Sequence, residues 1–319
     1  MHRLALALVA ALAVVVPLGF AGSTQKVTLT LDWTPNPDHV GFYDAQDTGL
    51  FARAGLDVAI RAPSDPTAPL KLVGVGRSDL AVSYEQELFF AAAKKLPVVA
   101  VAAVVPQPLN AFMSIEPGVT SLRDLRGRTI GITGVPSDYA ILKSAGLSGK
   151  VKVVALGYTL LPALLAHRVD AVLGVYRNVE GIQLQLRGLH PTIIPVDRAG
   201  VPNYDELVLV ASKTRLRDPA YHSTVQRFVT AFLAGTADAR RHPARALAIL
   251  KRATASDPKF LARATPATLR LLAGPKGVGC LSVPQWQRFG DWMQTHGLLK
   301  HRLSATSVVT TSFLPPRCR

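Results

Sequence analysis

The pattern of apolar and polar residues divides the chain near Ser212. Before this residue, short apolar or alternating runs recur between segments with helical spacing. Several runs are continuously apolar, as expected for strands that are buried on both faces of a sheet. The predicted strands read KVTLTLDW, GLDVAI, DLAVSY, LPVVAVAAVV, RTIGIT, KVKVVAL, DAVLGVY, TIIPV and ELVLVAS. Strands that alternate with helices predict an α/β fold with a parallel or mixed sheet.

After Ser212 the pattern becomes helical. In DPAYHSTVQRFVTAFLAGTADARRH, large apolar residues recur every three or four positions, which is typical of a helix with one buried face. Two further helices are predicted over residues 243–253 and 284–296.

Two segments of the α/β part share one order of features. LKLVGVGRSDLAVSY and LPALLAHRVDAVLGVY each contain a helical stretch, a short basic turn, an Asp, an apolar strand and a Tyr. Asp79 leads to Tyr84 in the first segment, and Asp170 leads to Tyr176 in the second. Two similar α/β units predict two similar lobes. Because ligands bind beyond the carboxyl ends of strands in open sheets, both tyrosines are expected to face one shared region.

With 319 residues, of which 49% are hydrophobic, the chain can bury a large core. At roughly 100–200 residues per domain, this length indicates about two domains. Residues 1–25 differ from the rest, because Arg3 precedes an uncharged apolar run and small residues flank Phe20. This composition predicts a secretory signal peptide, and therefore an exported protein of the periplasm or cell envelope. An uncleaved membrane anchor is the alternative, although Pro17 and the short run are marginal for a bilayer span.

The two cysteines, Cys280 and Cys318, both lie near the C-terminal end of the sequence. In an exported chain they can form a disulfide, and from the sequence a bridge and two free thiols are equally open. A bridge would stabilise the fold by roughly 4 kcal/mol on a loop-entropy estimate.

The formal net charge of +15 comes from the last third of the chain. Residues 213–319 contain 18 Lys and Arg against 4 Asp and Glu, whereas residues 26–212 contain 17 of each. The basic residues follow helical patterns without interleaved aromatic residues, which argues against a nucleic-acid partner. A solvated helical face is the favoured interpretation, and attraction to an anionic envelope surface is the alternative.

The segment LDWTPNPDHV, which ends the first predicted strand, is rich in polar groups. Trp33 offers a flat apolar face. Asp32, Asn36 and His39 offer hydrogen-bond donors and acceptors. A planar heterocycle with ring nitrogens and an amino group fits such a set, because stacking attracts the ring and the polar groups orient it. The alternative is a proline-shaped loop in which Asp38 caps the following helix.

Three other segments place polar groups at strand ends or helix starts. SYEQE, residues 83–87, supplies hydroxyl, phenol and carboxylate groups, although Ser83 and Glu87 also suit a helix cap and its first turn. GVPSDY places Ser137 at a helix start, where free N–H groups can bind a carboxylate, sulfonate, phosphate or carbonyl oxygen. In GVPNYDELVLV, a turn at Pro202 and Asn203 is sufficient to explain Asn203 and Tyr204. The Glu206 carboxylate could accept hydrogen bonds from an exocyclic amine and a protonated ring nitrogen.

The motifs of common catalytic sites do not occur. The sequence contains no Walker loop, Gly-x-Ser-x-Gly, HExxH or CxxC, and its histidines are scattered. Catalysis is therefore poorly supported, and no metal or cofactor is expected.

Six segments together resemble one family. These are LDWTPNPDHVGFYDAQDTGLFARAGLDV, SDLAVSYEQEL, AVVPQPLNAFMS, LRGRTIGITG, RVDAVLGVYRNVE and GVPNYDELVLVAS. In order and spacing, they are similar to the thiamine-pyrimidine-precursor-binding proteins of bacterial ABC importers, within the NMT1-like superfamily. The resemblance runs from about Val27 to Ala211.

The resemblance implies a type II periplasmic-binding-protein fold, an α/β fold with two lobes joined by two hinge crossings. The expected division is a signal peptide at 1–25, lobe 1 at 26–112, lobe 2 at 113–206, and a return to lobe 1 with C-terminal helices at 207–319. The resemblance also implies a formylaminopyrimidine or hydroxymethylpyrimidine ligand. The expected partners are ABC permease and ATPase subunits, and membrane contact is expected only through the permease or an uncleaved signal. Binders of riboflavin, taurine, other sulfonates or nitrate share this fold and remain alternatives.

The resemblance also implies a set of ligand-binding residues. Trp33 and Tyr84 are expected to contact the ring, with Tyr176 and Tyr204 closing from the other side. The expected set is Asp32, Trp33, Asn36, His39, Ser83, Tyr84, Glu85, Gly134, Pro136, Ser137, Tyr176, Asn178, Asn203, Tyr204 and Glu206.

The same superfamily contains enzymes that build the thiamine pyrimidine from their own histidine and pyridoxal phosphate. Those enzymes carry a Lys and a His after the third strand, and a cysteine-rich run before the strand that returns to lobe 1. Here these places read SYEQEL and GVPNY. The resemblance therefore favours a binding protein over an enzyme.

Overall fold

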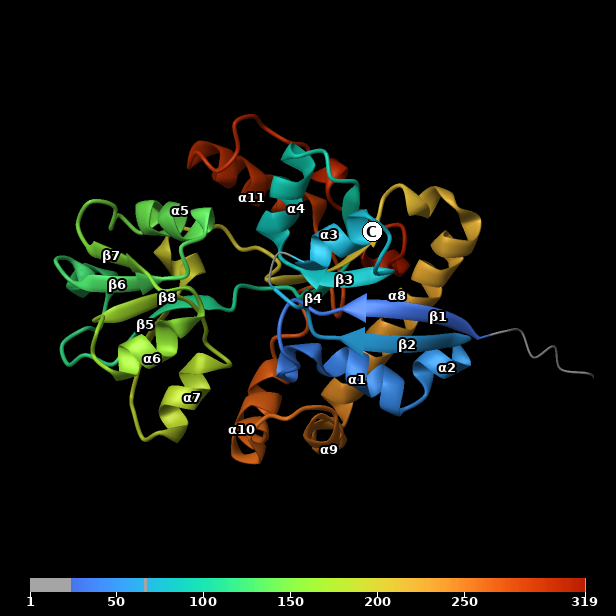
Figure 1. Ribbon diagram of the computed structural model, residues 1–319, viewed down its shortest axis with the longest axis horizontal. Coiled ribbons are helices and arrows are strands. Elements are labelled where there is room, and N and C mark those ends of the chain that lie inside the picture. The colour runs from blue at the N-terminus through green and yellow to red at the C-terminus, as the bar shows by residue number, and fades with distance from the viewer. Residues whose placement is uncertain (1–23, 66–67, 319) are drawn as a thin grey trace, which may run out of the picture.

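Two mixed sheets organise the computed structural model, which describes residues 24–65 and 68–318 (Figure 1). The first sheet has the strand order β2-β1-β3-β10-β4. Strand β10 is antiparallel to both of its neighbours, whereas β1 is parallel to β2 and β3. The bounds are β1 Gln25–Thr30, β2 Leu56–Arg61, β3 Leu80–Ser83, β4 Val98–Val105 and β10 Leu207–Ser212.

The second sheet repeats this arrangement with the order β7-β6-β8-β5-β9. Here β5 is the antiparallel strand, between β8 and β9, and β6 is parallel to β7 and β8. The bounds are β5 Asn110–Ser114, β6 Thr129–Ile132, β7 Lys152–Ala155, β8 Ala171–Tyr176 and β9 Thr192–Pro195. The expected two-lobed α/β fold is thereby confirmed.

The chain passes between the lobes twice, over residues 106–109 and 200–206. Each passage delivers the antiparallel strand of the next sheet, β5 after the first and β10 after the second. All nine predicted strands are present, but β5 was not predicted. The division expected after residue 112 falls inside β5, whose Asn110 already pairs with Tyr176 in the second sheet.

Helices cover both sheets, and the last four extend lobe 1 (Figure 1). In lobe 1 the first helices are α1 Val40–Asp47, α2 Leu50–Arg53, α3 Ala68–Gly74 and α4 Glu85–Ala93. Lobe 2 contains α5 Pro136–Ser144, α6 Leu160–Leu165 and α7 Glu180–Leu186. The C-terminal helices are α8 Pro219–Arg241, α9 Pro243–Ala253, α10 Pro258–Leu269 and α11 Val283–Thr295. Among the described residues, every helix is too short or too polar to cross a bilayer.

Helix α8 is held against lobe 1 by close packing on α1. Its apolar face carries Phe232, which stacks on Phe42 with ring centroids 4.3 Å apart. Gly235 allows the two helices to approach, because a Cβ atom there would lie 2.6 Å from the Gly41 carbonyl oxygen. The helical pattern predicted after Ser212 is therefore core packing.

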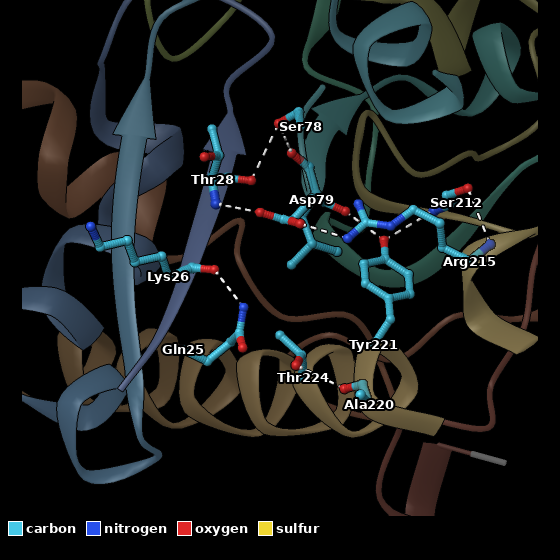
Figure 2. Close-up of polar contacts among 11 residues, drawn as sticks. Gln25, Lys26, Thr28, Ser78, Asp79, Ser212, Arg215, Ala220, Tyr221 and Thr224 are labelled. Atoms are coloured by element: carbon cyan, nitrogen blue, oxygen red, sulfur yellow. Dashed lines mark hydrogen bonds and ion pairs between the residues drawn. The ribbon is translucent and has the colours of Figure 1, made fainter. Parts of the chain in front are cut away.

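The internal repeat has a structural cause at the amino ends of the strands. The Asp79 carboxylate accepts a hydrogen bond from the Thr28 N–H of β1 at 2.8 Å, as Figure 2 shows. In lobe 2 the Asp170 carboxylate accepts from the Thr129 N–H of β6 at 2.7 Å. Each Asp therefore ties its own strand to the parallel neighbour. In lobe 1, Arg215 adds an ion pair to Asp79 at 2.9 Å (Figure 2).

The C-terminal tail is fixed to lobe 1. Cys280 and Cys318 form a disulfide, so the bridge that the sequence left open is present. Val309 of the tail also forms an isolated parallel bridge with Ala100 of β4. Most of the predicted signal peptide, residues 1–23, lies outside the described residues.

Candidate functional site

The loop after β1 is a short 3-10 helix, η1 Pro37–His39, capped by its own polar residues. The Asn36 side chain accepts from the Asp38 N–H at 2.8 Å, so Asn36 caps η1, whereas the alternative interpretation of the sequence had Asp38 as the cap. The Asn36 N–H donates to His39 Nδ1 at 3.2 Å. Because Nδ1 accepts, the imidazole is neutral and carries its proton on Nε2. His39 Nε2 therefore donates to the Asp32 carboxylate at 2.7 Å.

Asp32 connects this loop to the segment after β3. Its second carboxylate oxygen accepts from the Tyr84 hydroxyl at 3.1 Å. Asp32 and His39 are buried, whereas Trp33 and Tyr84 are half-buried and pack on the core. His39 therefore orients Asp32, and Asp32 orients the Tyr84 ring.

Tyrosines from the two lobes share one environment. Burial raises the pKa of Tyr176 well above its usual value, and the nearby Glu206 carboxylate raises it further. Tyr84, Asp32 and Tyr204 also lie close enough to contribute to this pKa shift. Tyr84 of lobe 1, bonded to Asp32, and Tyr176 of lobe 2, bonded to Glu206, are therefore within electrostatic range of each other.

Glu206 joins the two passages between the lobes. Its Oε2 accepts from the backbone N–H groups of Leu109 and Asn110 at 2.7 and 3.0 Å, and from the Tyr204 hydroxyl at 2.9 Å. Its Oε1 accepts from the Tyr176 hydroxyl at 3.3 Å. Burial raises the pKa of Glu206, and these hydrogen bonds oppose that rise. Glu206 Oε2 is therefore structural, and Oε1 bonds to the Tyr176 hydroxyl.

Glu85 binds the second passage between the lobes. It is fully buried, and its Oε2 accepts from the Asp205 N–H at 2.7 Å and from Gln285 Nε2 at 3.0 Å. The Asp205 carboxylate accepts from Trp286 Nε1 at 2.7 Å. Burial raises the pKa of Asp205 to about 7 and raises the pKa of Glu85 well above its usual value. Two buried acids and α11 thus hold residues 203–206 in place.

The start of α5 differs from the expected oxygen-binding turn. The Gly134 N–H donates to the Asp138 carboxylate at 2.9 Å, and the Thr133 hydroxyl donates to the same oxygen at 2.5 Å. Pro136 has no N–H group to offer. Gly134 and Pro136 are exposed, and Ser137 is half-buried. An acid of the chain itself therefore occupies part of this turn.

Ser137 also lines a small pocket between the lobes, with a cavity volume of about 20 Å³. The pocket is lined by Gln86, Asn110, Ser137, Ile141, Val201, Tyr204, Phe289, Trp292 and Leu298. Elsewhere, Ser83 is buried within β3 opposite Val208, and Asn203 is exposed on the second passage. Asn178 contacts lobe 1, where its Nδ2 donates to the Asp38 carboxylate at 2.6 Å.

Sequence reasoning missed Asp205, Gln285 and Trp286, which support the second passage. Asp205 stands between two selected residues in NYDE, but a single Asp in a turn gives no sign of burial. Gln285 and Trp286 lie on a helix whose pattern indicates packing alone. Their contacts join positions about 80 and 200 residues apart, so local spacing carries no signal of them.

Comparisons with known proteins identify the family and the fold. The family model described as NMT1/THI5 like matches residues 36–246. A putative thiamine biosynthesis protein from Haemophilus influenzae is 37% identical over 225 residues, which are 69% of this chain and 70% of that one. A formylaminopyrimidine-binding protein from Halalkalibacterium halodurans is 33% identical over 294 residues, which are 88% of each chain.

A solved structure with the same architecture is the ligand-binding component of an ABC-type import system from Staphylococcus aureus. Its TM-score is 0.70 at 15% identity, and the match covers 91% of this chain and 97% of that one. A 4-amino-5-hydroxymethyl-2-methylpyrimidine phosphate synthase from Legionella pneumophila is 23% identical over 305 residues, covering 91% of this chain and 93% of that one. The two-lobed fold is thus that of periplasmic binding proteins, and the chain belongs to the NMT1/THI5 like family.

Proposed function

We propose that this protein is the exported solute-binding component of an ABC importer, and that it binds a pyrimidine precursor of thiamine of the formylaminopyrimidine or hydroxymethylpyrimidine type. The main support is that tyrosines of different lobes lie in one environment. Tyr84 donates to Asp32, Tyr176 donates to Glu206, and these groups are within electrostatic range of one another. The relative named for binding formylaminopyrimidine supports the ligand class.

Each part of the cluster has a role in recognising a flat amino-substituted ring. Trp33, Tyr84 and Tyr176 supply ring contact, since aromatic faces attract planar heterocycles. Asp32 and Glu206 accept hydrogen bonds from an exocyclic amine or a protonated ring nitrogen. His39 acts through Asp32 and is a positioning residue.

The two passages between the sheets serve as the hinge in this proposal. The moving units meet at residues 106–109 and 200–206, and Glu206 links both passages at the hinge. A ligand that contacts both lobes favours the closed state by its extra contacts there. The closed form then docks on the permease, whose ATPase subunits drive import, on the extracytoplasmic side of the membrane.

The charges of the site separate this proposal from anionic ligands with the same fold. Taurine, other sulfonates and nitrate need N–H donors and positive charge. The turn before α5 instead directs the Gly134 N–H to the Asp138 carboxylate, and the buried carboxylates of Asp32 and Glu206 bond to Tyr84 and Tyr176. These acids favour an amine-bearing ring over an anion.

A synthase is the second candidate, because relatives with that name match the chain. The segments SYEQEL and GVPNY lack the Lys, His and cysteines that this reaction implies. We therefore propose binding without turnover. Incubation with pyridoxal phosphate and iron should leave every histidine intact by mass spectrometry, and a histidine lost in step with product formation would establish the synthase instead.

A thermal-shift panel tests the ligand class. Formylaminopyrimidine, hydroxymethylpyrimidine, thiamine, riboflavin and taurine are each added to the purified protein. A true ligand stabilises the folded state by RT ln(1 + [L]/Kd), which is about 2.7 kcal/mol at 100 times Kd. The proposal expects a higher melting temperature with the first two compounds. A shift with taurine or riboflavin alone would overturn the pyrimidine assignment.

A further inference from the structure

A buried hydrogen-bond cluster connects the lobes on the side of η1. Asn178, which follows β8 in lobe 2, donates from Nδ2 to Asp38 Oδ1 at 2.6 Å and to Thr268 Oγ1 of α10 at 2.9 Å. Asp38 is 1% exposed, Asn178 is 3% exposed and Thr268 is 0% exposed. Helix α10 packs on both η1 and α7, so this cluster forms only when the lobes are together.

Two oxygens of this cluster lack a partner. Asp38 Oδ2 and Asn178 Oδ1 are buried and make no hydrogen bond to any described residue. The amide nitrogen of Asn178 is already donating to Asp38 and Thr268, and a carboxylate has no proton to donate. Buried oxygens left in this state destabilise a structure. A proton on Asp38 Oδ2 would supply the one donor that the pair is missing.

The groups that face Asp38 favour its neutral form. Burial raises the pKa of Asp38 to about 7, and the Asp32 and Glu180 carboxylates raise it while Asn178 and His39 lower it. The contribution of His39 requires a charged imidazole. However, its Nδ1 accepts the Asn36 N–H, so the ring is neutral in this arrangement.

We propose that Asp38 is a positioning residue which is protonated when the lobes are closed, and that its acid–amide contact with Asn178 makes closure take up one proton. The contact holds lobe 2 against η1 and α10. It therefore sets the ratio of closed to open molecules even in the ligand-free protein.

The sign of the pH dependence follows from linkage. Opening exposes Asp38 to water, where a carboxyl group titrates near its ordinary value of about 4. The proton is then bound more tightly in the closed state, so closure is favoured at low pH. As pH rises from about 4 to about 7, the closed-to-open ratio falls by up to about tenfold per pH unit, and above about pH 7 it levels off.

Small-angle X-ray scattering of the ligand-free protein tests this proposal, independently of which ligand is correct. The wild type should expand as pH rises from 5.5 to 8.5. Asp38→Asn keeps an acceptor for Asn178 Nδ2 and adds the missing donor, so this variant should stay compact at every pH. The control Asp57→Asn changes an exposed acid of β2, away from the passages, and should keep the wild-type response.

A second variant distinguishes opening of the lobes from misfolding. Asn178→Ala removes the amide, so the protein should be open at every pH while its circular dichroism stays that of a folded chain. A wild-type radius of gyration that is independent of pH would overturn the proposal. So would an Asp38→Asn variant that still expands as pH rises from 5.5 to 8.5.

Discussion

At the residue scale, the site depends on polar groups that fix one another. Asn36 caps η1 and sets the tautomer of His39, and His39 orients Asp32. The sequence identified Asp32, Asn36 and His39 as a group, because they gather where a strand ends beside prolines. Sequence alone could not assign their partners, since both Asn36 and Asp38 are common helix caps.

Glu206→Gln tests the structural role of the Glu206 carboxylate. The variant loses a charged acceptor for the Leu109 and Asn110 N–H groups and the Tyr204 hydroxyl. Hydrogen bonds to charged groups contribute about 1.5–3 kcal/mol, so the free energy of unfolding should fall by that order. Urea denaturation measures it, with the exposed Asp57→Asn as the matched control. Equal losses in both variants would refute a special role for Glu206.

At the element scale, apolar runs determined most of the fold. Nine strands follow from such runs, and the predicted helix over residues 243–253 matches α9. Strand β5 was missed because NAFMS is short and follows PQPLN, which reads as a loop. Helix α10 was missed because Pro266 interrupts its pattern. Pairing in the second sheet buries β5 and overrides its weak local signal.

The disulfide that pins the C-terminal tail gives an element-scale prediction. Cys280 and Cys318 are 38 residues apart, and a loop of this size is worth roughly 4 kcal/mol of unfolding free energy. Replacing both cysteines with serine should lower stability by that order in thermal denaturation, without a change in circular dichroism. Stability equal to that of the wild type would show that the bridge does not constrain the unfolded chain.

Asp205 gives a pH-dependent prediction for the second passage. Its pKa is raised to about 7, so its contribution to stability is complete at low pH and is lost as pH rises through about 7. Between about pH 4 and pH 7, the wild type should lose up to about 1.4 kcal/mol per pH unit relative to Asp205→Asn, and above about pH 7 this loss is complete. Denaturant titrations at pH 5.5 and 8.5 measure the difference. A pH-independent difference would place Asp205 outside this linkage.

At the scale of the whole molecule, the fold presents equivalent parts of two lobes to each other. The Asp79 and Asp170 carboxylates tie the amino ends of matching strand pairs, and Tyr84 and Tyr176 stand at the opposite ends. The sequence contained this equivalence as a repeated pattern, so the convergence was predictable. The contacts that join the lobes at Asp38 and Asn178 were not, because no local pattern relates positions 140 residues apart.

Titration calorimetry with formylaminopyrimidine tests the central claim, that aromatic residues of both lobes bind one ligand. The wild type should bind with one site per chain. Tyr84→Ala and Tyr176→Ala should each weaken binding by about tenfold or more, because each removes one aromatic contact from the ring. Absence of binding to the wild type, or wild-type affinity in either variant, would contradict the account.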